Sequence, residues 1–84
     1  MIVRIRLFAI LREQAGVQSI DVELEDDATV ADALRALGEE ERLSDLLARL
    51  PVQMAVNRDY ATPETRLRAD DELALIPPVS GGAR

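Results

Sequence analysis

The sequence predicts an α+β fold in which a mixed β-sheet packs against a helix. Near both ends of the chain, apolar and polar residues alternate with period two, a pattern typical of half-buried strands. Between these segments, residues 30–37 carry apolar side chains at the spacing of a single helical face. The 84 residues allow only one small core. The apolar faces of the sheet and of the helix must therefore bury each other.

The first alternating segment, residues 1–11, is predicted to be a strand with one apolar side. Its second side combines arginines with Phe8, the only phenylalanine of the chain. Two explanations of Phe8 stay open at this point: a loop of the same chain covers it, or it contacts a partner. The apolar side holds Val3, Ile5, Leu7 and Ala9, and the second side holds Ile2, Arg4, Arg6 and Phe8.

A second strand is expected at residues 19–24, after a short helical turn at residues 12–16. Gly16 ends this turn, as glycine often does at the C-terminus of a helix. Apolar residues alternate with polar ones along the second strand, so one of its faces is solvated. Because the connection is short, the first two strands should pair as an antiparallel hairpin, which an acidic turn at residues 25–27 closes.

Residues 29–38 are predicted to form the helix that lies on the sheet. Thr29 is a suitable N-cap, and Asp32 three residues later gives a weak form of the capping box. Gly38 ends this helix in a position like C′, and a second helix is expected at residues 39–50. The apolar stripe of the first helix is Val30, Ala33, Leu34 and Leu37, and that of the second is Leu43, Leu46, Leu47 and Leu50.

The last third of the chain supplies the remaining strands, at residues 52–56 and 72–76. A turn at residues 57–59 leads to Tyr60, for which the sequence favours packing beneath a loop. Residues 61–69 include a proline and should form an irregular crossing with at most a short edge strand. The first and last strands are expected to lie parallel at the centre of the sheet, joined through the helical layer. This arrangement is the β-grasp.

The C-terminal segment differs from the rest of the chain. Its two consecutive prolines lack backbone donors, so neither a helix nor a central strand continues through them. Gly81 and Gly82 have no side chain, which lets the backbone enter a channel that a Cβ atom would block. We therefore divide the chain into a β-grasp domain over residues 1–78 and a flexible tail over residues 79–84.

The charge and hydropathy of the chain restrict its partners. A net charge of −6 argues against binding to nucleic acid or to an anionic membrane and favours a partner with a basic surface. No apolar run reaches membrane-spanning length, and the N-terminus lacks the apolar region of a signal peptide. A cytoplasmic location is therefore expected.

The residue types that are missing restrict the chemistry. The chain has no cysteine, histidine, lysine or tryptophan, which excludes thiol, imidazole and Schiff-base catalysis and the usual soft-metal sites. The functional interpretation treats the C-terminal glycine as a chemical group: transfer of AMP from ATP converts its carboxylate to an acyl-adenylate that sulfur can attack. With no cysteine in the chain, any sulfur that it carries must be at this terminus. The alternative is a disordered tail without a function, because glycine-rich termini commonly fray.

Several motifs together resemble the small subunit of molybdopterin synthase, the sulfur carrier of molybdenum-cofactor biosynthesis. The resemblance covers essentially the whole chain, and its most specific part is the C-terminal motif. The motifs are Leu7-Phe8-Ala9 with Arg12, Glu13 and Gly16; Thr29-Val30-Ala31-Asp32-Ala33-Leu34; Ala55-Val56-Asn57; Asp71-Glu72-Leu73-Ala74; and Ile76-Pro77-Pro78-Val79-Ser80-Gly81-Gly82.

The resemblance implies a ubiquitin-like β-grasp fold and a chemical role for Gly82. An E1-like enzyme that uses ATP would adenylate Gly82, and a persulfide donor would supply the sulfur of a thiocarboxylate. The tail would enter the synthase large subunit and deliver sulfur to precursor Z, cyclic pyranopterin monophosphate. ATP and any zinc belong to the activating enzyme, so no cofactor or metal is expected on this chain. The implied tail-threading residues are Val79, Ser80 and Gly81, and the implied partner-binding residues are Phe8, Tyr60, Ile76, Pro77 and Pro78.

Two features depart from the family pattern. Asp70 occupies a position that is usually glycine, and Ala83 and Arg84 follow Gly82, so its carboxylate is not free in the chain as written. We expect a processing protease to remove these two residues. The alternatives are a modifier or carrier for thiamin synthesis or tRNA thiolation, and a binding module that donates no sulfur. For Ile76, a core position and an interface position both stay open.

Overall fold

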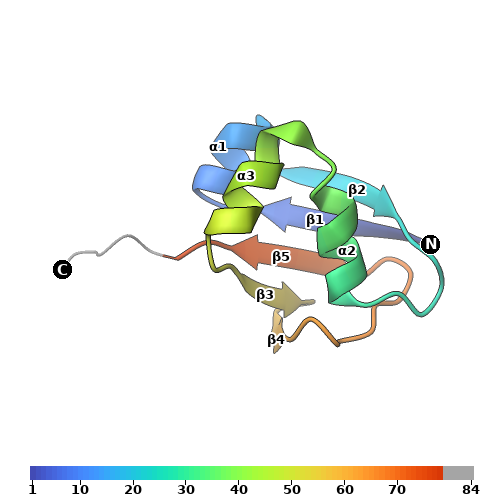
Figure 1. Ribbon diagram of the computed structural model, residues 1–84. Coiled ribbons are helices and arrows are strands. Elements are labelled where there is room, and N and C mark those ends of the chain that lie inside the picture. The colour runs from blue at the N-terminus through green and yellow to red at the C-terminus, as the bar shows by residue number, and fades with distance from the viewer. Residues whose placement is uncertain (79–84) are drawn as a thin grey trace.

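One mixed sheet forms the centre of the molecule, and the helices lie together over one of its faces (Figure 1). The computed structural model describes residues 1–78, so the predicted tail residues Val79, Ser80, Gly81 and Gly82 lie outside it, and the predicted domain boundary stays a prediction. The strands are β1 (Ile2–Leu7), β2 (Ser19–Glu23), β3 (Gln53–Val56), β4 (Asp59–Ala61) and β5 (Glu72–Ile76), and the helices are α1 (Ile10–Ala15), α2 (Val30–Leu37) and α3 (Glu41–Arg49).

The order of strands across the sheet is β2-β1-β5-β3-β4. The central pair, β1 and β5, is parallel, whereas β1 pairs with β2 and β3 pairs with both β4 and β5 in antiparallel orientation. The first and last strands of the chain therefore lie side by side (Figure 1). This topology confirms the predicted β-grasp arrangement of a mixed sheet packed against a helix.

The core lies between the sheet and the helices. Val3, Ile5 and Leu7 of β1 and Leu73 and Leu75 of β5 point into it and are 0–2% exposed, as their alternation predicts. Burying each such side chain stabilises the fold by roughly 1.5–3 kcal/mol relative to an exposed one. The helices and the crossing before β5 supply the other fully enclosed residues, which are Leu11, Val30, Ala33, Leu37, Leu43 and Leu67.

Helix α2 begins where the capping box predicts. The Thr29 N–H donates to Asp32 Oδ2 at 2.9 Å, and the Asp32 N–H donates to Thr29 Oγ1 at 3.4 Å. Two backbone donors that would lack a helical partner are thereby satisfied. Gly38 follows the last helical residue as expected, but its φ of −65° is right-handed rather than the left-handed conformation common at C′.

Two details of the predicted strands are wrong. The first strand ends at Leu7 rather than Leu11, because Ala9 has a φ of 53° and starts the turn into α1. Ala9 is consequently exposed and does not share the core side of β1. The short edge strand, expected within residues 61–69, is β4 at Asp59–Ala61, so it ends at the first residue of that crossing.

No helix within residues 1–78 combines the length and the apolar character that a membrane crossing requires.

Candidate docking surface beside the end of the last strand

Strand β5 delivers the C-terminal segment from a fixed position in the sheet. It pairs with β1 on one side and with β3 on the other (Figure 1); the pairing with β1 reaches Leu75, and the pairing with β3 reaches Ile76. Pro77 is buried and Pro78 is exposed. The last described residues therefore leave the molecule from a strand that is paired on both sides, next to the end of β1.

The face of the sheet away from the helices brings three predicted docking residues together. Arg6 lies opposite Ala74 on the parallel pair. Phe8, which directly follows β1, and Ile76 at the end of β5 line the same hollow. Ala55 lies opposite both Ala74 and Tyr60, which extends the row of Arg6 and Ala74 across β3 to β4. We call this surface the outer-face patch; its residues are Phe8, Ala55, Tyr60, Ala74 and Ile76.

The outer-face patch is hollowed, and charged side chains line its rim. The hollow has a volume of about 340 Å³. Arg6 Cζ lies 5.3 Å from the centre of the Phe8 ring, within the range of a cation–π contact, and Arg6 Nη1 lies 3.8 Å from Glu72 Oε1. The rim residues that share the hollow with the patch are Arg6, Arg58 and Glu72.

A second, more apolar hollow adjoins the patch at the end of β5. It has a volume of about 660 Å³ and shares Phe8 and Ile76 with the outer-face patch. Leu46 and Leu50 of the α3 region form its far wall, although sequence reasoning assigned them only to a helical stripe. The sequence contains a weak indication of this position, because the apolar stripe continues to the last turn of the helix. Apolar residues there can extend beyond the part of the sheet that the helix covers. The remaining lining residues are Ala9, Ile10, Pro77 and Pro78.

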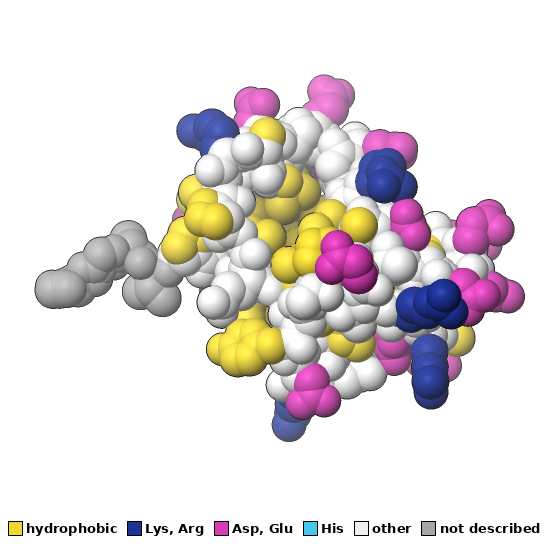
Figure 2. All heavy atoms as spheres, turned by 60° about the horizontal axis from the view of Figure 1, so that its bottom comes forward, with side chains coloured by type: hydrophobic (Ala, Val, Ile, Leu, Met, Phe, Trp, Pro, Cys, Tyr) yellow, Lys and Arg dark blue, Asp and Glu magenta, His cyan; other side chains and the backbone are white. Residues whose placement is uncertain are grey.

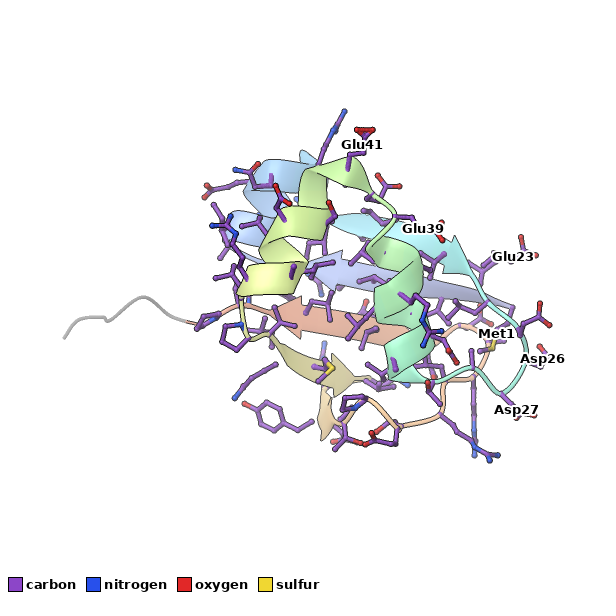
Figure 3. All side chains as sticks on the ribbon, in the orientation of Figure 1. Met1, Glu23, Asp26, Asp27, Glu39 and Glu41 are labelled. Carbon is purple, nitrogen blue, oxygen red and sulfur yellow. The ribbon has the colours of Figure 1, made fainter. Side chains whose placement is uncertain are left out.

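Hydrophobic side chains gather where β5 ends, whereas acidic side chains lie mostly toward the other parts of the surface (Figure 2). Figure 3 shows Glu23, Asp26 and Asp27 projecting outward at the opposite end of the sheet, near Met1. Within residues 1–78, no group of three or more acidic, histidine or cysteine side chains is arranged to hold a metal ion. Most acidic side chains in Figure 2 therefore lie away from the apolar surface at the end of β5, and Glu72 is the carboxylate that lines the outer-face hollow.

The pKa of the Asp32 carboxyl is lowered, and this residue lies on the helical side of the sheet. The hydrogen bond from the Thr29 N–H, followed by the bond from the Arg35 guanidinium at 2.9 Å, holds the pKa of the Asp32 carboxyl below 3.8. Both partners favour the charged form. This shift belongs to the helix cap rather than to a reactive site.

The predicted docking residues differ in their surroundings. Tyr60 is 81% exposed, so the expectation that it packs beneath a loop is wrong. Edge strand β4 pairs only with β3, and its register turns Tyr60 to the face without helices. Phe8 and Ile76 are half-buried and line both hollows, whereas Pro77 is buried. Their contact with a partner stays a prediction.

Comparison with known proteins adds three relatives. The model of the ThiS family matches residues 5–82. The chain is 38% identical to small archaeal modifier protein 1 of Haloferax volcanii, over 92% of this chain and 97% of that protein. A crystal structure of that modifier superposes with a TM-score of 0.86 at 35% identity, covering 98% of this chain and all of the other.

The second relative is the molybdopterin synthase sulfur carrier subunit of Chlamydomonas reinhardtii, which is 36% identical over 98% of this chain and 100% of its own length. The third is a structure of the complex of subunits 1 and 2 of the molybdopterin-converting factor from Helicobacter pylori. One of its chains superposes with a TM-score of 0.69 at 28% identity, covering 98% of this chain and 100% of that chain. The resemblance that the motifs indicate is therefore confirmed over the full length.

Proposed function

This chain belongs to the ThiS family, and from that premise we propose that it is a sulfur carrier, the small subunit of a molybdopterin synthase. The observation that supports this most directly is the position of Phe8, Tyr60 and Ile76. They line one hollow beside the end of β5, the strand that leads to Gly82, with Tyr60 exposed and Phe8 and Ile76 half-buried. A surface of this kind on a small acidic domain is typical of protein docking.

The reactive group of the proposed carrier is the carboxylate of Gly82. In the sequence this carbon is in an amide bond to Ala83, and an amide cannot be adenylated. A protease first removes Ala83 and Arg84, and an E1-like enzyme then joins the freed carboxylate to AMP with release of pyrophosphate. The terminal sulfur of a persulfide donor attacks the acyl carbon and displaces AMP, which gives an acyl disulfide. A thiol then attacks the donor's sulfur, so that the thiocarboxylate of Gly82 leaves and the donor and the thiol form a disulfide. ATP is consumed by the activating enzyme and is not bound by this chain.

The proposed partner is the large subunit of the synthase, which would receive residues 79–82 and catalyse sulfur transfer to precursor Z. The Helicobacter pylori complex supports this partner, because one of its chains matches this chain over nearly its whole length. The outer-face patch and the hollow at the end of β5 would contact the large subunit. Fixing the end of β5 between two strands positions the segment that the large subunit must receive.

A second candidate function is protein modification, which the 38% identity to an archaeal modifier favours. In that case the activated Gly82 would be joined to an amine of another protein instead of receiving sulfur. Conjugation assays with chains ending at Gly82 and at Arg84 separate the two: covalent adducts on lysines identify a modifier. Carriers for thiamin synthesis or tRNA thiolation, and a binding module that donates no sulfur, are the remaining alternatives.

Tandem mass spectrometry of the C-terminal peptide, taken from protein isolated in its native host, tests the proposal. We expect a peptide that ends at Gly82 with sulfur in place of one carboxylate oxygen. Fragmentation is needed because oxidation of Met1 or Met54 gives nearly the same change in intact mass. A terminus found only at Arg84 in cells that make molybdopterin would refute the carrier chemistry and leave the binding module.

A further inference from the structure

Arg58 lies beside an apolar hollow and has no ion-pair partner within residues 1–78. It lines the outer-face hollow with Phe8, Tyr60 and Ile76. The ion pairs within residues 1–78 are Arg4–Asp21, Arg6–Glu72 and Arg35–Asp32, and none of them includes Arg58. The rim therefore has two guanidinium groups, from Arg6 and Arg58, and one carboxylate, which Arg6 already faces. The patch has an unmatched positive charge on a chain whose net charge is −6.

The turn that presents Arg58 is held in place by hydrogen bonds. Asn57 Nδ2 donates to Asp71 Oδ1 at 2.9 Å, the Glu72 N–H donates to Asn57 Oδ1 at 3.0 Å, and the Asn57 N–H donates to the Glu72 carbonyl at 2.9 Å. These bonds tie the β3–β4 turn to the start of β5. The base of the Arg58 side chain is thus fixed before any partner binds, which lowers the entropic cost of an ion pair.

The backbone at this turn gives no local reason for an arginine. Asn57 and Arg58 have φ values of 49° and 77°, as in the two-residue hairpin turns in which glycine commonly takes the second position. An arginine there is less favourable than a glycine, which adopts the left-handed conformation without steric cost. Within residues 1–78, no ion pair of its side chain offsets this disadvantage.

We propose that the outer-face patch docks a protein surface that presents an apolar side chain next to a carboxylate, and that Arg58 pairs with this carboxylate. The apolar side chain enters the hollow between Phe8, Tyr60 and Ile76. Charge complementarity then selects an acidic docking site, contrary to the basic partner that the net charge alone favours. The inference rests on the proposed function, because the partner used to test it is the molybdopterin synthase large subunit of the same organism.

The test measures the dissociation constant of the chain and that large subunit by isothermal titration calorimetry, at low and high salt. We expect Arg58→Ala to weaken binding about tenfold and Arg58→Glu about a hundredfold. Arg58→Lys keeps the charge without the planar fork and should lie between wild type and alanine. The loss of affinity caused by Arg58→Ala should be smaller at high salt, because salt screens the ion pair that Arg58 of the wild-type chain makes with the carboxylate.

Arg66→Glu is the matched control. Arg66 is exposed, lies outside the outer-face hollow and is absent from the described ion pairs, and its substitution changes the net charge equally. We expect the dissociation constant of this variant to lie within about twofold of the wild-type value at high salt, where the effect of overall charge is screened. Equal affinities of Arg58→Glu and Arg66→Glu would overturn the proposal while leaving the proposed function intact.

A wild-type chain that does not bind the large subunit would overturn both proposals. Should Arg58→Glu fail to fold, the Nε–Hε resonance of Arg58 in the ¹⁵N-labelled wild-type chain provides a second measurement. Pairing with a carboxylate in the complex is expected to shift this resonance and to slow its exchange with water. An unchanged Arg58 resonance in the saturated complex would also overturn the inference.

Discussion

Leu7 and Phe8 are neighbours in the chain but face opposite sides of the sheet. Leu7 is 2% exposed and belongs to the core, whereas Phe8 is half-buried and lines the outer-face patch. The two side chains therefore make different contributions: Leu7 stabilises the fold, and Phe8 contributes apolar surface for docking. Comparing alanine substitutions at the two positions separates these contributions.

We expect Phe8→Ala to weaken binding of the synthase large subunit about tenfold. Its free energy of unfolding should fall by about 1 kcal/mol or less, because much of the ring already contacts solvent. Leu7→Ala is the control and should cost about 2–5 kcal/mol of stability, the range for emptying a buried leucine site. Urea denaturation and calorimetric binding measure the two effects. Phe8 would be a core residue if its alanine variant lost stability to the same extent and bound with unchanged affinity.

Asp70 shows why the family favours glycine at its position. Its φ of 69° is left-handed, a conformation that an aspartate tolerates and a glycine adopts without cost. Its backbone N–H still donates to the Ile2 carbonyl at 3.2 Å, so the turn keeps its link to β1. The departure from the family pattern thus leaves the turn in place and strains it slightly.

We expect Asp70→Gly to raise the free energy of unfolding by up to about 1 kcal/mol, since relief of the left-handed strain exceeds the added entropy of the unfolded chain. Ala69→Gly is the matched control. Ala69 is not among the residues with positive φ, so this change should lower stability by about 0.5–1 kcal/mol. Thermal denaturation of both variants measures the difference. A loss of equal size in both would show that Asp70 is not strained.

At the scale of single elements, helix α2 depends on the charge of Asp32. The folded pKa of this carboxyl lies below 3.8 because the Thr29 N–H and then Arg35 favour its charged form. A group whose folded pKa is lowered releases its proton more readily when folded. Its contribution to stability is therefore present above pH 3.8 and is lost as the pH falls through the lower folded value.

We expect Asp32→Asn to be less stable than wild type near neutral pH and to approach wild-type stability in strong acid, below the folded pKa of Asp32. Urea denaturation at both pH values measures the gap between the two proteins. Asp45→Asn in α3 serves as the control, because its carboxylate has no ion-pair partner within residues 1–78. If the difference in stability between Asp32→Asn and wild type did not change with pH, the charge of Asp32 would not be what stabilises α2.

At the scale of the whole molecule, the proposed function gives the domain and its terminus separate roles. The core and the outer-face patch are complete within residues 1–78, whereas the proposed chemistry occurs at Gly82. Changes at the terminus should therefore alter reaction without altering folding. This separation allows stability and sulfur transfer to be measured independently in one protein.

We expect a chain that ends at Gly82 to form a thiocarboxylate with the activating enzyme, ATP and a persulfide donor, and a chain that ends at Arg84 to form none. Gly82→Ala in the shorter chain should keep the melting temperature and reduce molybdopterin formation, since a Cβ atom obstructs a narrow channel. Mass spectrometry and a molybdopterin assay provide the readouts. Unchanged molybdopterin formation by Gly82→Ala would argue against threading of the terminus into the large subunit.

The sequence by itself determined most of the elements and their order along the chain. Alternation placed Val3, Ile5, Leu73 and Leu75 in the core, and these residues are buried. The capping residues located the start of α2 at Thr29. These features depend on neighbours within a few residues, so local patterns suffice to predict them. The family motifs added the chemical role proposed for the terminus.

Only the tertiary structure decided how the docking surface is assembled. Tyr60 belongs to an edge strand of three residues, too short for its alternation to indicate a face, and the pairing of Ala55 with Tyr60 turns it outward. Arg58 reaches the same hollow because its turn is bonded to residues 71–72. Such a surface depends on the register between strands far apart in the sequence. Register is set by the packing of the whole sheet, and a shift of one residue would reverse every side chain.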